Sequence, residues 1–587
     1  MEKLIEKLSN IVKDIFEGFG YDRRYGAVTV SNRSDLCQFQ CNGALSAAKE
    51  YKKAPIYIAK EIIEELKNVD ILESVSTAGP GFININIKDD FLTSYINQIY
   101  NDDNLGCLKA ENPKTIIVDY GGANVAKPLH VGHLRAAIIG ESIKRISRFL
   151  GHTVIGDVHL GDWGLQMGMV ISELKRRKPH LPYFDENHRD EYPETPPFTL
   201  DELEEIYPTA SKLAKNDDKV MEEAKKITVE LQRGRNGYIA LWKHILNVSV
   251  ADLRKNYGNL NVEFDLWKGE SDSQDYMDEM IKYLKENNYT LESQGALVVD
   301  VSKESDTDTI PPFIVLKSDG ATLYSTTDLA TIWGRVIDYD PDEIIYVVDK
   351  RQGLHFEQVF RCAKKTKIVE EDLKFDFIGF GTMNGKDGKP FKTREGGVMR
   401  LQDLIEIIKD NVRDKLKENN SIEDDEIDEI ARKVGLSALK YGDLSNVITK
   451  DYIFDIDKFS SFEGNTGPYI LYTIVRIKSI LKKISAECPS FSKNILKPYG
   501  EVERDLMLKL SKFNELVELS FMDKSPNKIC EYIYETSNLF NRFYHNNRII
   551  SEVDLDKKMS WINLITLTKN ILETGLNLLG IDAPDKM

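Results

Sequence analysis

No hydrophobic run in the sequence approaches the ~18 residues that a membrane-spanning helix needs. The first seven residues are charged throughout and lack the apolar core of a signal peptide. The chain has only 6 cysteines among 587 residues and no CxxC pair, which argues against a disulfide framework and against a structural metal site. These absences predict a protein of the reducing cytoplasm with no membrane anchor.

Basic residues are also fewer than acidic residues. The chain has 78 Lys and Arg against 95 Asp and Glu, a net charge of −17. Such a surface repels nucleic acid on average, so any nucleic-acid binding must use local basic patches. The length of 587 residues predicts about three or four domains, and 41% hydrophobic residues suits a globular protein.

The N-terminal part has the patterns of a small α+β domain, residues 1–107. Apolar residues from Leu4 to Phe16 recur at helical spacing and predict an amphipathic helix. Residues 83–87 alternate between isoleucine and asparagine, which predicts a strand with one face in water. The polar stretch 101–104 is the expected linker to the next domain.

Residues 112–400 show strands alternating with helices. The predicted strands are 115–120, 153–157, 343–348 and 375–380, with a helix over 131–150. This alternation predicts a Rossmann-type α/β domain with a parallel sheet, interrupted by a charged, mostly helical insertion over about 172–275. After residue 401 strand signals fade, which predicts a helical connector (401–455) and an all-helical C-terminal domain (456–587).

The sharpest motif is His130-Val131-Gly132-His133, which follows a predicted strand and a glycine turn and opens a predicted helix. Residues three apart at a helix start share a face, so both imidazoles point with the unpaired N–H groups of the first turn. With the helix dipole they form an anion site, and Gly132 leaves room for a flat base. The alternatives are two ordinary buried histidines or a metal pair, and a metal needs a third ligand that is not evident nearby.

A second motif is the glycine-rich loop 385–397, which carries Lys386, Lys389, Lys392 and Arg394. A loop of this kind can close on a triphosphate and stabilise charge that develops in a transition state. It is not a Walker loop, because the glycine spacing differs and Lys386 is followed by Asp. Taken alone it would be a solvated hairpin; beside the histidine motif, a phosphate function is favoured.

The two motifs together resemble those of class I aminoacyl-tRNA synthetases. The histidine motif is similar to HIGH, and residues 389–394 stand where KMSKS belongs, with Pro390 and Phe391 in place of Met and Ser. Lys127, three residues before His130, is an extra cation. The altered loop motif and several further segments are similar to those of bacterial-type arginyl-tRNA synthetases. The resemblance extends over essentially the whole chain. Those segments are 39–44, 119–135, 161–168, 323–328, 352–356, 463–470 and 579–587.

The resemblance implies an arginine pocket. A guanidinium is planar, forked and permanently charged, so it pairs with carboxylates. The residues implied are Asp119, Asp328 and Tyr324 for the guanidinium, Asn124 and Gln352 for the α-amino or carboxylate end, and His159, Asp162 and Gln166 as possible pocket lining. Both aspartates also stand where Asp is favoured for structural reasons, at a strand end and at a helix start.

The resemblance also implies ATP as a substrate, accompanied by Mg²⁺, with no structural metal ion. The catalytic residues implied are His130 and His133 at the phosphates and ribose, and Lys127, Lys389 and Lys392 at the leaving pyrophosphate. Gly132 and the backbone near Gly381 and Met383 are implied to contact ATP.

The implied activity is arginine–tRNA ligation. Arginine is activated to arginyl-adenylate and then transferred to the 3′ end of tRNA(Arg), with release of AMP and pyrophosphate. The N-terminal domain would bind tRNA, the C-terminal domain would bind the anticodon, and the protein would act as a cytoplasmic monomer. Candidate tRNA contacts are Phe39, Gln40, Asn42, Tyr469, Tyr472, Phe543 and Tyr544.

Two other functions compete with this one. A different nucleotidyl transferase of the same superfamily would share the histidine motif but lack the two flanking tRNA-binding domains. A non-catalytic tRNA-binding paralogue would be expected to have lost His133 or the loop cations, and these are present.

Overall fold

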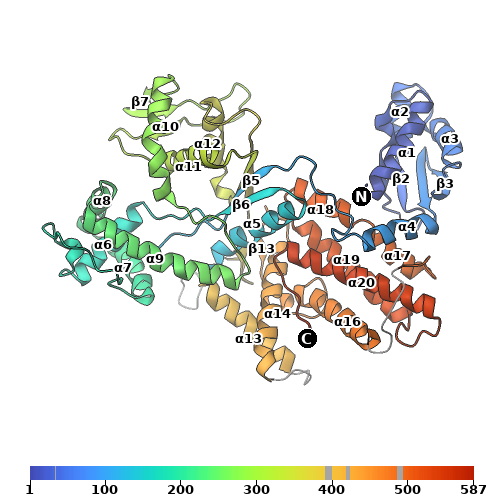
Figure 1. Cartoon of the computed structure of the whole chain (residues 1–587). Helices are drawn as coiled ribbons and strands as arrows, with labels where there is room; N and C mark the ends of the chain where they lie inside the picture. Colours follow the sequence, from blue (N-terminus) through green and yellow to red (C-terminus); the bar gives the residue numbers. More distant parts are fainter. Residues whose placement is uncertain (34, 390–398, 418–423, 486–493) are drawn as a thin grey trace.

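The computed structural model describes residues 1–33, 35–389, 399–417, 424–485 and 494–587 (Figure 1). None of the helices in these ranges is both long and apolar enough to span a membrane. The N-terminal part is an antiparallel sheet of order β1-β2-β4-β3 covered by helices. Its elements are α1 (Leu4–Gly18), η1 (Arg23–Gly26), β1 (Val28–Val30), β2 (Phe39–Cys41), α2 (Gly43–Glu50), α3 (Pro55–Leu66), β3 (Leu72–Ala78), β4 (Phe82–Ile87) and α4 (Asp89–Tyr100).

The predicted strand over 83–87 is confirmed as β4, but the predicted solvent-exposed face is not. Ile83 and Ile85 are fully buried, as the alternation predicts, yet Asn84 is only 5% exposed. The side chain of Gln40 on the neighbouring strand donates a hydrogen bond to Asn84 Oδ1 (2.9 Å). A buried amide is tolerated when it is hydrogen-bonded, so cross-strand amide pairing replaces hydration on this face.

The central sheet is parallel and has the order β11-β10-β5-β6, which confirms the predicted fold class. Its strands are β5 (Thr115–Asp119), β6 (Thr153–Asp157), β10 (Glu343–Asp349) and β11 (Lys374–Phe380). Ile117 and Ile344 enter the hydrophobic cluster on one face, and Ile116 and Ile345 enter the cluster on the other. Burial on both faces explains the continuous apolar runs of these strands. The strand order reverses between β5 and β10, where parallel sheets bind ligands.

The insertion is helical and is followed by a three-stranded antiparallel sheet that the sequence patterns did not predict (Figure 1). The elements from α5 to α12, apart from the central strands, are α5 (Val131–Phe149), α6 (Leu165–Arg177), η2 (Pro182–Phe184), α7 (Leu200–Asn216), α8 (Asp218–Gln232), α9 (Asn236–Asn259), η3 (Glu270–Ser273), α10 (Gln274–Glu286), β7 (Leu291–Ser293), β8 (Ala296–Val299), β9 (Phe313–Leu316), α11 (Tyr324–Tyr339), η4 (Lys350–Gln352) and α12 (Gly353–Lys365).

The remainder of the chain is helical, with a short parallel pair of strands at its beginning. Its elements are β12 (Met383–Asn384), α13 (Leu401–Lys417), α14 (Asp424–Leu444), β13 (Tyr452–Ile453), α15 (Ile456–Phe459), α16 (Gly467–Ser485), α17 (Glu501–Leu510), α18 (Phe513–Met522), α19 (Asn527–Asn546) and α20 (Leu555–Leu578).

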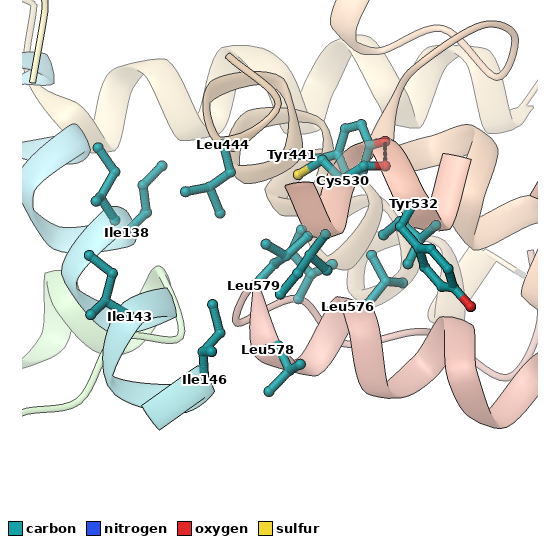
Figure 2. Packing of buried hydrophobic residues seen from close by; sticks show 14 of the residues in the cluster. Ile138, Ile143, Ile146, Tyr441, Leu444, Cys530, Tyr532, Leu576, Leu578 and Leu579 are labelled. Carbon is teal, nitrogen blue, oxygen red and sulfur yellow. Dashed lines mark hydrogen bonds between the residues drawn. The ribbon is translucent and has the colours of Figure 1, made fainter. Parts of the chain in front are cut away.

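Helix α5 lies at the centre of the molecule and contacts α13, α14, α18 and α20. Figure 2 shows Ile146 of α5 facing the end of α20, near Leu578. Full burial of such a side chain contributes about 1.5–3 kcal/mol, so this contact ties the C-terminal helices to the helix that follows β5. The position of the C-terminal helices is therefore fixed relative to the central sheet.

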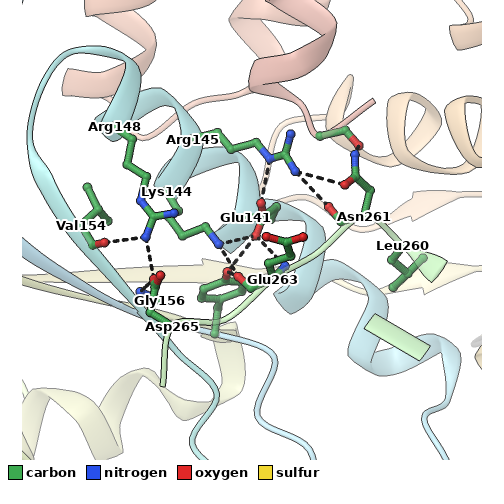
Figure 3. Close-up of polar contacts among 12 residues, drawn as sticks. Glu141, Lys144, Arg145, Arg148, Val154, Gly156, Leu260, Asn261, Glu263 and Asp265 are labelled. Atoms are coloured by element: carbon green, nitrogen blue, oxygen red, sulfur yellow. Dashed lines mark hydrogen bonds and ion pairs between the residues drawn. The ribbon is translucent and has the colours of Figure 1, made fainter. Parts of the chain in front are cut away.

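The opposite side of α5 is held by buried charges (Figure 3). Glu141 pairs with Lys144 (2.8 Å) and Arg145 (2.7 Å), and it accepts the N–H of Glu263 (3.2 Å). Burial alone would raise the pKa of Glu141, but the two cations outweigh it and lower that pKa. This network attaches α5 to the segment that returns from the insertion.

The N-terminal part docks on the C-terminal helices, with α4 beside α17 (Figure 1). Arg504 of α17 pairs with Asp89 (2.6 Å). Asn97 of α4 and the backbone of Ile495 exchange two hydrogen bonds (2.7 and 2.8 Å). The two ends of the chain therefore form one continuous surface beside the central sheet.

Lys440 of α14 is fully buried and donates from Nζ to the carbonyl oxygens of Leu260 (2.8 Å) and Gly580 (2.7 Å). Burial lowers the pKa of Lys440 from 10.5 to about 7. Between these values the unfolded chain binds more protons than the folded one, so the free energy of unfolding gains a contribution as pH rises through this interval.

We therefore expect Lys440→Met to remove this pH dependence. The thermal midpoint of the wild type, relative to that of the variant, should rise between pH 7 and pH 10. Lys282→Met is the matched control, because its side chain is 71% exposed. A difference between wild type and Lys440→Met that stays constant over this range would contradict the prediction.

Candidate active site

The two histidines of the sequence motif cap the first turn of α5. His130 is the N-cap residue, and its Nδ1 accepts the N–H of Gly132 (3.0 Å). The N–H of His130 in turn donates to Nδ1 of His133 (3.2 Å). Backbone N–H groups can only donate, so each Nδ1 is an acceptor and the proton of each neutral ring sits on Nε2. Both rings therefore present an Nε2–H donor at the positive end of the helix.

The electrostatics of the pair favour neutral rings. Burial, together with nearby His130 and Lys127, lowers the pKa of His133 to about 3. Burial and Lys127 also lower the pKa of His130. The ring centroids are 3.9 Å apart, so two charged rings would repel each other strongly. The sequence left open whether these donors are neutral or cationic, and the geometry favours neutral donors.

Gly132 is required by the fold of its own motif. A Cβ at this position would lie 2.8 Å from Cε1 and 2.9 Å from Nδ1 of His130. Any side chain here would displace the imidazole and break the reciprocal cap. The space that we expected to admit a flat base is thus partly filled by the ring of His130.

The insertion holds the segment that precedes the histidines. Nζ of Lys127 lies 4.3 Å from the ring centroid of Tyr207 on α7. The N–H of Ala126, whose φ is +59°, donates to Oγ of Ser249 on α9 (2.9 Å). Cation–π contact and this hydrogen bond fix the extra cation beside the α5 start. The insertion, to which the sequence assigned no role, thus positions the segment that carries Lys127.

The cationic loop returns to the histidine motif. The N–H of Val131 donates to the carbonyl of Met399 (3.1 Å), and Arg400 pairs with Glu204 of the insertion (2.9 Å). At the other end of the loop, the N–H of Lys389 donates to Asp387 (3.1 Å). Lys392, with the rest of 390–398, lies outside the described residues.

Gly381 and Met383 belong to the junction between the sheet and the connector. The N–H of Gly381 donates to Ile448 (3.0 Å), and its carbonyl accepts from Arg135 (2.8 Å). Met383 is 6% exposed and pairs with Tyr452 between β12 and β13. The N–H of Gly381 is therefore engaged within the protein, and contact of this backbone with ATP remains a prediction.

Asp119 is paired with a protein arginine. Nη2 of Arg335 on α11 lies 2.6 Å from Oδ2 of Asp119 and 2.6 Å from Oδ2 of Asp157. Nη1 of Arg335 donates to the hydroxyl of Tyr346 (3.1 Å). Burial raises the pKa of Asp119, and Arg335 opposes that rise. Oδ2 of Asp119, the carboxylate expected to bind the substrate, is therefore already paired with Arg335. Oδ1 of Asp119 accepts no hydrogen bond from a described residue.

A second carboxylate lies nearer the surface. Helix α11 begins at Tyr324, which is 65% exposed, and Asp328 follows one turn later. Oδ2 of Asp328 lies 2.6 Å from Nε2 of His355. Gln352 is exposed and precedes the first residue of α12. Asn124, which follows β5, forms a parallel bridge with Gly161. These residues all stand beyond the carboxyl ends of β5 and β10.

The three possible lining residues have different surroundings. Asp162 is 1% exposed and accepts hydrogen bonds from the N–H (3.0 Å) and Oγ (2.6 Å) of Ser271. The side chain of Gln166 donates to the carbonyl of Val125. Both are thus engaged in holding loops. Both ring nitrogens of His159 are buried without a described partner beside a cavity of about 20 Å³, room for one water.

The candidate tRNA contacts fall into two groups, buried side chains and accessible ones. Phe39 and Phe543 are 1% and 0% exposed, so both rings pack in the core and offer no surface to tRNA in this structure. The other candidates remain at least partly accessible. They are Gln40, which bonds Asn84; Asn42, which is exposed; Tyr469, whose hydroxyl donates to Asn538 (2.7 Å); Tyr472, which is 42% exposed; and Tyr544, which is half-buried.

Sequence reasoning missed Arg135, Arg335 and His355. Arg335 lies seven residues after Asp328, two turns along one helix face, and interrupts an apolar stretch. Arg135 interrupts a similar stretch in α5. A lone charge at the buried face of an amphipathic helix is a usable signal for an internal ion pair. His355 was noticed only as part of a matching segment.

Arg335→Met should destabilise the protein strongly. It would leave Asp119 and Asp157 buried without their cation, a loss of about 3–5 kcal/mol in the free energy of unfolding. Arg335→Lys keeps the charge but lacks the fork that reaches both carboxylates, so its loss should be smaller. Urea unfolding followed by circular dichroism measures both. Equal stability of wild type and Arg335→Met would show that the buried pair is dispensable.

Comparison with known families identifies all three parts of the chain. Residues 95–456 match the family described as tRNA synthetases class I (R), catalytic domain. Residues 2–87 match the arginyl tRNA synthetase N terminal domain, and residues 470–587 match the DALR anticodon binding domain.

Relatives match over the full length. The arginine–tRNA ligase of Alkaliphilus oremlandii is 71% identical, and that of Agathobacter rectalis is 56% identical, with 100% of both chains covered in each case. The arginyl-tRNA synthetase of Plasmodium falciparum has a TM-score of 0.81 at 26% identity, again over 100% of both chains. The Thermus thermophilus arginyl-tRNA synthetase shares the fold, with a TM-score of 0.77 at 21% identity and 100% coverage of both chains.

Proposed function

The chain belongs to the arginyl-tRNA synthetase family and is an arginine–tRNA ligase, and we propose that both steps of its reaction take place between the start of α5 and the starts of α11 and α12. The carboxylate of L-arginine attacks the α-phosphate of ATP, which releases pyrophosphate and leaves arginyl-adenylate. The terminal ribose of tRNA(Arg) then takes the arginyl group and releases AMP. The alternative of a non-catalytic paralogue has no support, because full-length relatives carry the ligase name.

The observation that carries the ATP side is the reciprocal cap of His130 and His133. Because each Nδ1 accepts a backbone N–H, each Nε2–H is free to donate to a phosphate or ribose oxygen. Such donors need no reorganisation during the reaction and stabilise the charge that develops on the phosphates. Gly132 contributes by permitting the ring positions, and the first-turn N–H groups of α5 add to the anion site.

Cations complete the phosphate site. Lys127, held against Tyr207, and the loop lysines Lys389 and Lys392 stabilise the leaving pyrophosphate in this proposal. Mg²⁺ enters with ATP and neutralises its phosphates. A resident ion does not fit the one described group of close carboxylate and histidine atoms, Asp119, Asp157 and His159, because Arg335 already pairs with both carboxylates.

The arginine side rests on Asp328 and Tyr324, which present a carboxylate and a hydroxyl to the guanidinium. Asp119 contributes through Oδ1, while Arg335 holds its other oxygen. Asn124 and Gln352 stand beyond the ends of β5 and β10 and bind the α-amino and carboxylate groups. A planar guanidinium held by two carboxylates explains a preference for arginine over lysine.

The nucleic-acid partner in this proposal is tRNA(Arg), which contacts both ends of the chain. Supporting this, the N-terminal part and the C-terminal helices pack side by side and form one surface. Tyr472, 42% exposed with Arg476 against its ring (4.8 Å), is the strongest candidate for stacking on a base. The enzyme works as a monomer in the cytoplasm.

The test of the substrate is the attachment of each radiolabelled amino acid to total tRNA. Only arginine should become attached, and attachment should require ATP. Transfer of a different amino acid, or no transfer, would refute the proposed activity.

His133→Ala should lower the rate of arginyl-adenylate formation by about 10²–10³-fold, the scale of losing one preorganised donor. The Michaelis constant for arginine should change little, because His133 lies on the ATP side. Single-turnover kinetics with tRNA(Arg) present measures the rate. His180→Ala, at an exposed position, is the matched control. Adenylate formation at the wild-type rate would remove His133 from the mechanism.

Asp328→Asn should raise the Michaelis constant for arginine by about 10²–10³-fold, because the guanidinium loses a carboxylate in a partly desolvated site. The Michaelis constant for ATP should stay within a few-fold. Steady-state aminoacylation at varied arginine and varied ATP separates the two. Unchanged arginine dependence would show that Asp328 does not bind the guanidinium.

A further inference from the structure

A hydrogen bond between two side chains joins the N-terminal parts of α11 and α12. Asp328 lies on the second turn of α11, and His355 lies on the first turn of α12. Nε2 of His355 is 2.6 Å from Oδ2 of Asp328, the length of a charge-assisted bond. A carboxylate can only accept when ionised, so the imidazole donates from Nε2. The bond joins the helices that precede and follow β10 in the chain.

The imidazole of His355 is held on two sides by aromatic rings. The ring centroid of Tyr324 lies 4.7 Å away, and that of Phe356 lies 4.9 Å away. Phe356 in turn packs against Tyr346 (4.7 Å), whose hydroxyl accepts from Arg335. The side chains of His355 and Asp328 are 14% and 23% exposed. The ring is therefore braced by the core and the bond is shielded from most solvent.

The bond uses only half of the carboxylate. Oδ1 of Asp328 accepts no hydrogen bond from any residue that the structure describes. We infer that His355 is a positioning residue for amino-acid recognition: it fixes the rotamer of Asp328 and leaves Oδ1 to accept an N–H of the arginine guanidinium. This inference rests on the proposed role of Asp328. Binding groups are most effective when a neighbouring residue locks their orientation before the ligand arrives.

The opposite role would be competition, in which the imidazole occupies Asp328 and must leave before arginine binds. The two roles predict opposite changes when the imidazole is removed. A competitor would lower arginine affinity while present, so its removal would decrease the Michaelis constant. A positioning residue raises affinity, so its removal would increase that constant. The contacts of His355 with Tyr324 and Phe356 favour positioning, because they hold the imidazole in place beside Asp328.

The experiment compares three substitutions of His355. His355→Leu removes the donor and should raise the Michaelis constant for arginine about tenfold or more, the scale of a hydrogen bond to a charged group. The turnover number should change less, and the Michaelis constant for ATP should not change. His355→Gln places an amide N–H where Nε2 stood and should restore most of the affinity. His355→Asn places its amide near Nδ1 instead and should not.

Controls separate positioning from folding. His180→Leu introduces the same apolar side chain at an exposed position and should leave arginine dependence unchanged. Thermal midpoints by circular dichroism show whether each variant folds. Should His355→Leu fail to fold, the contrast between the two amide variants carries the test, because both keep a polar side chain at the site.

Comparison with Asp328→Asn separates this inference from the proposed function. The double variant Asp328→Asn with His355→Leu should be no weaker for arginine than Asp328→Asn alone, because His355 acts through that carboxylate. If Asp328→Asn raises the arginine Michaelis constant and His355→Leu leaves it unchanged or lowers it, positioning is refuted and the pocket stands. If Asp328→Asn has no effect, the pocket and the positioning role both fall.

Discussion

The buried guanidinium of Arg135 is the constraint on which the geometry of the site depends. It lies on the second turn of α5, is 2% exposed, and pairs with Asp443 of α14 (Nε to Oδ2, 3.1 Å). It also donates to the carbonyls of Gly381 (2.8 Å) and Lys450 (3.1 Å). A buried cation is tolerated only when its donors are satisfied, so α5, the end of the sheet and the connector must meet at this point. The capped histidines therefore have a fixed place relative to the base of the cationic loop.

A second buried guanidinium, that of Arg335, fixes the position of the helix that carries Asp328. It joins the last residues of β5 and β6 to α11, the helix that carries Asp328. The two arginines belong to different helices: Arg135 to α5, which begins with the capped histidines, and Arg335 to α11, which carries Asp328. Because β5 lies beside β10, the ends of both strands open into the same space. In the proposed function, strand order and two internal ion pairs place the ATP and arginine sites within reach of one reaction.

Much of this arrangement can be predicted from the sequence, and the features that cannot be predicted share one cause. The runs at 115–120 and 343–348 predicted buried parallel strands, and the structure confirms them because local hydrophobicity decides their burial. The place of the histidines at the start of α5 also followed from local signals. The partner of Asp119 did not, since Arg335 is 216 positions away in the chain. The burial of Phe39 and Phe543 could not be predicted from the sequence for the same reason: whether a ring is exposed depends on what packs over it, which spacing alone does not reveal.

In the proposed mechanism, neutral histidines explain why the lysines are also needed. Burial and the nearby ammonium of Lys127 disfavour protonation of His133, so this ring contributes a directed N–H but no full charge. Charge that develops on the leaving pyrophosphate must then be balanced by cations that approach it. Lys127 is fixed by Tyr207, while Lys389 stands at the edge of a loop whose far end, at Met399, meets the start of α5. In the proposed site, the neutral donors therefore orient the phosphates and the lysines supply the positive charge. A pair of cationic histidines could not do both, because their mutual repulsion at 3.9 Å would undo the cap that orients them.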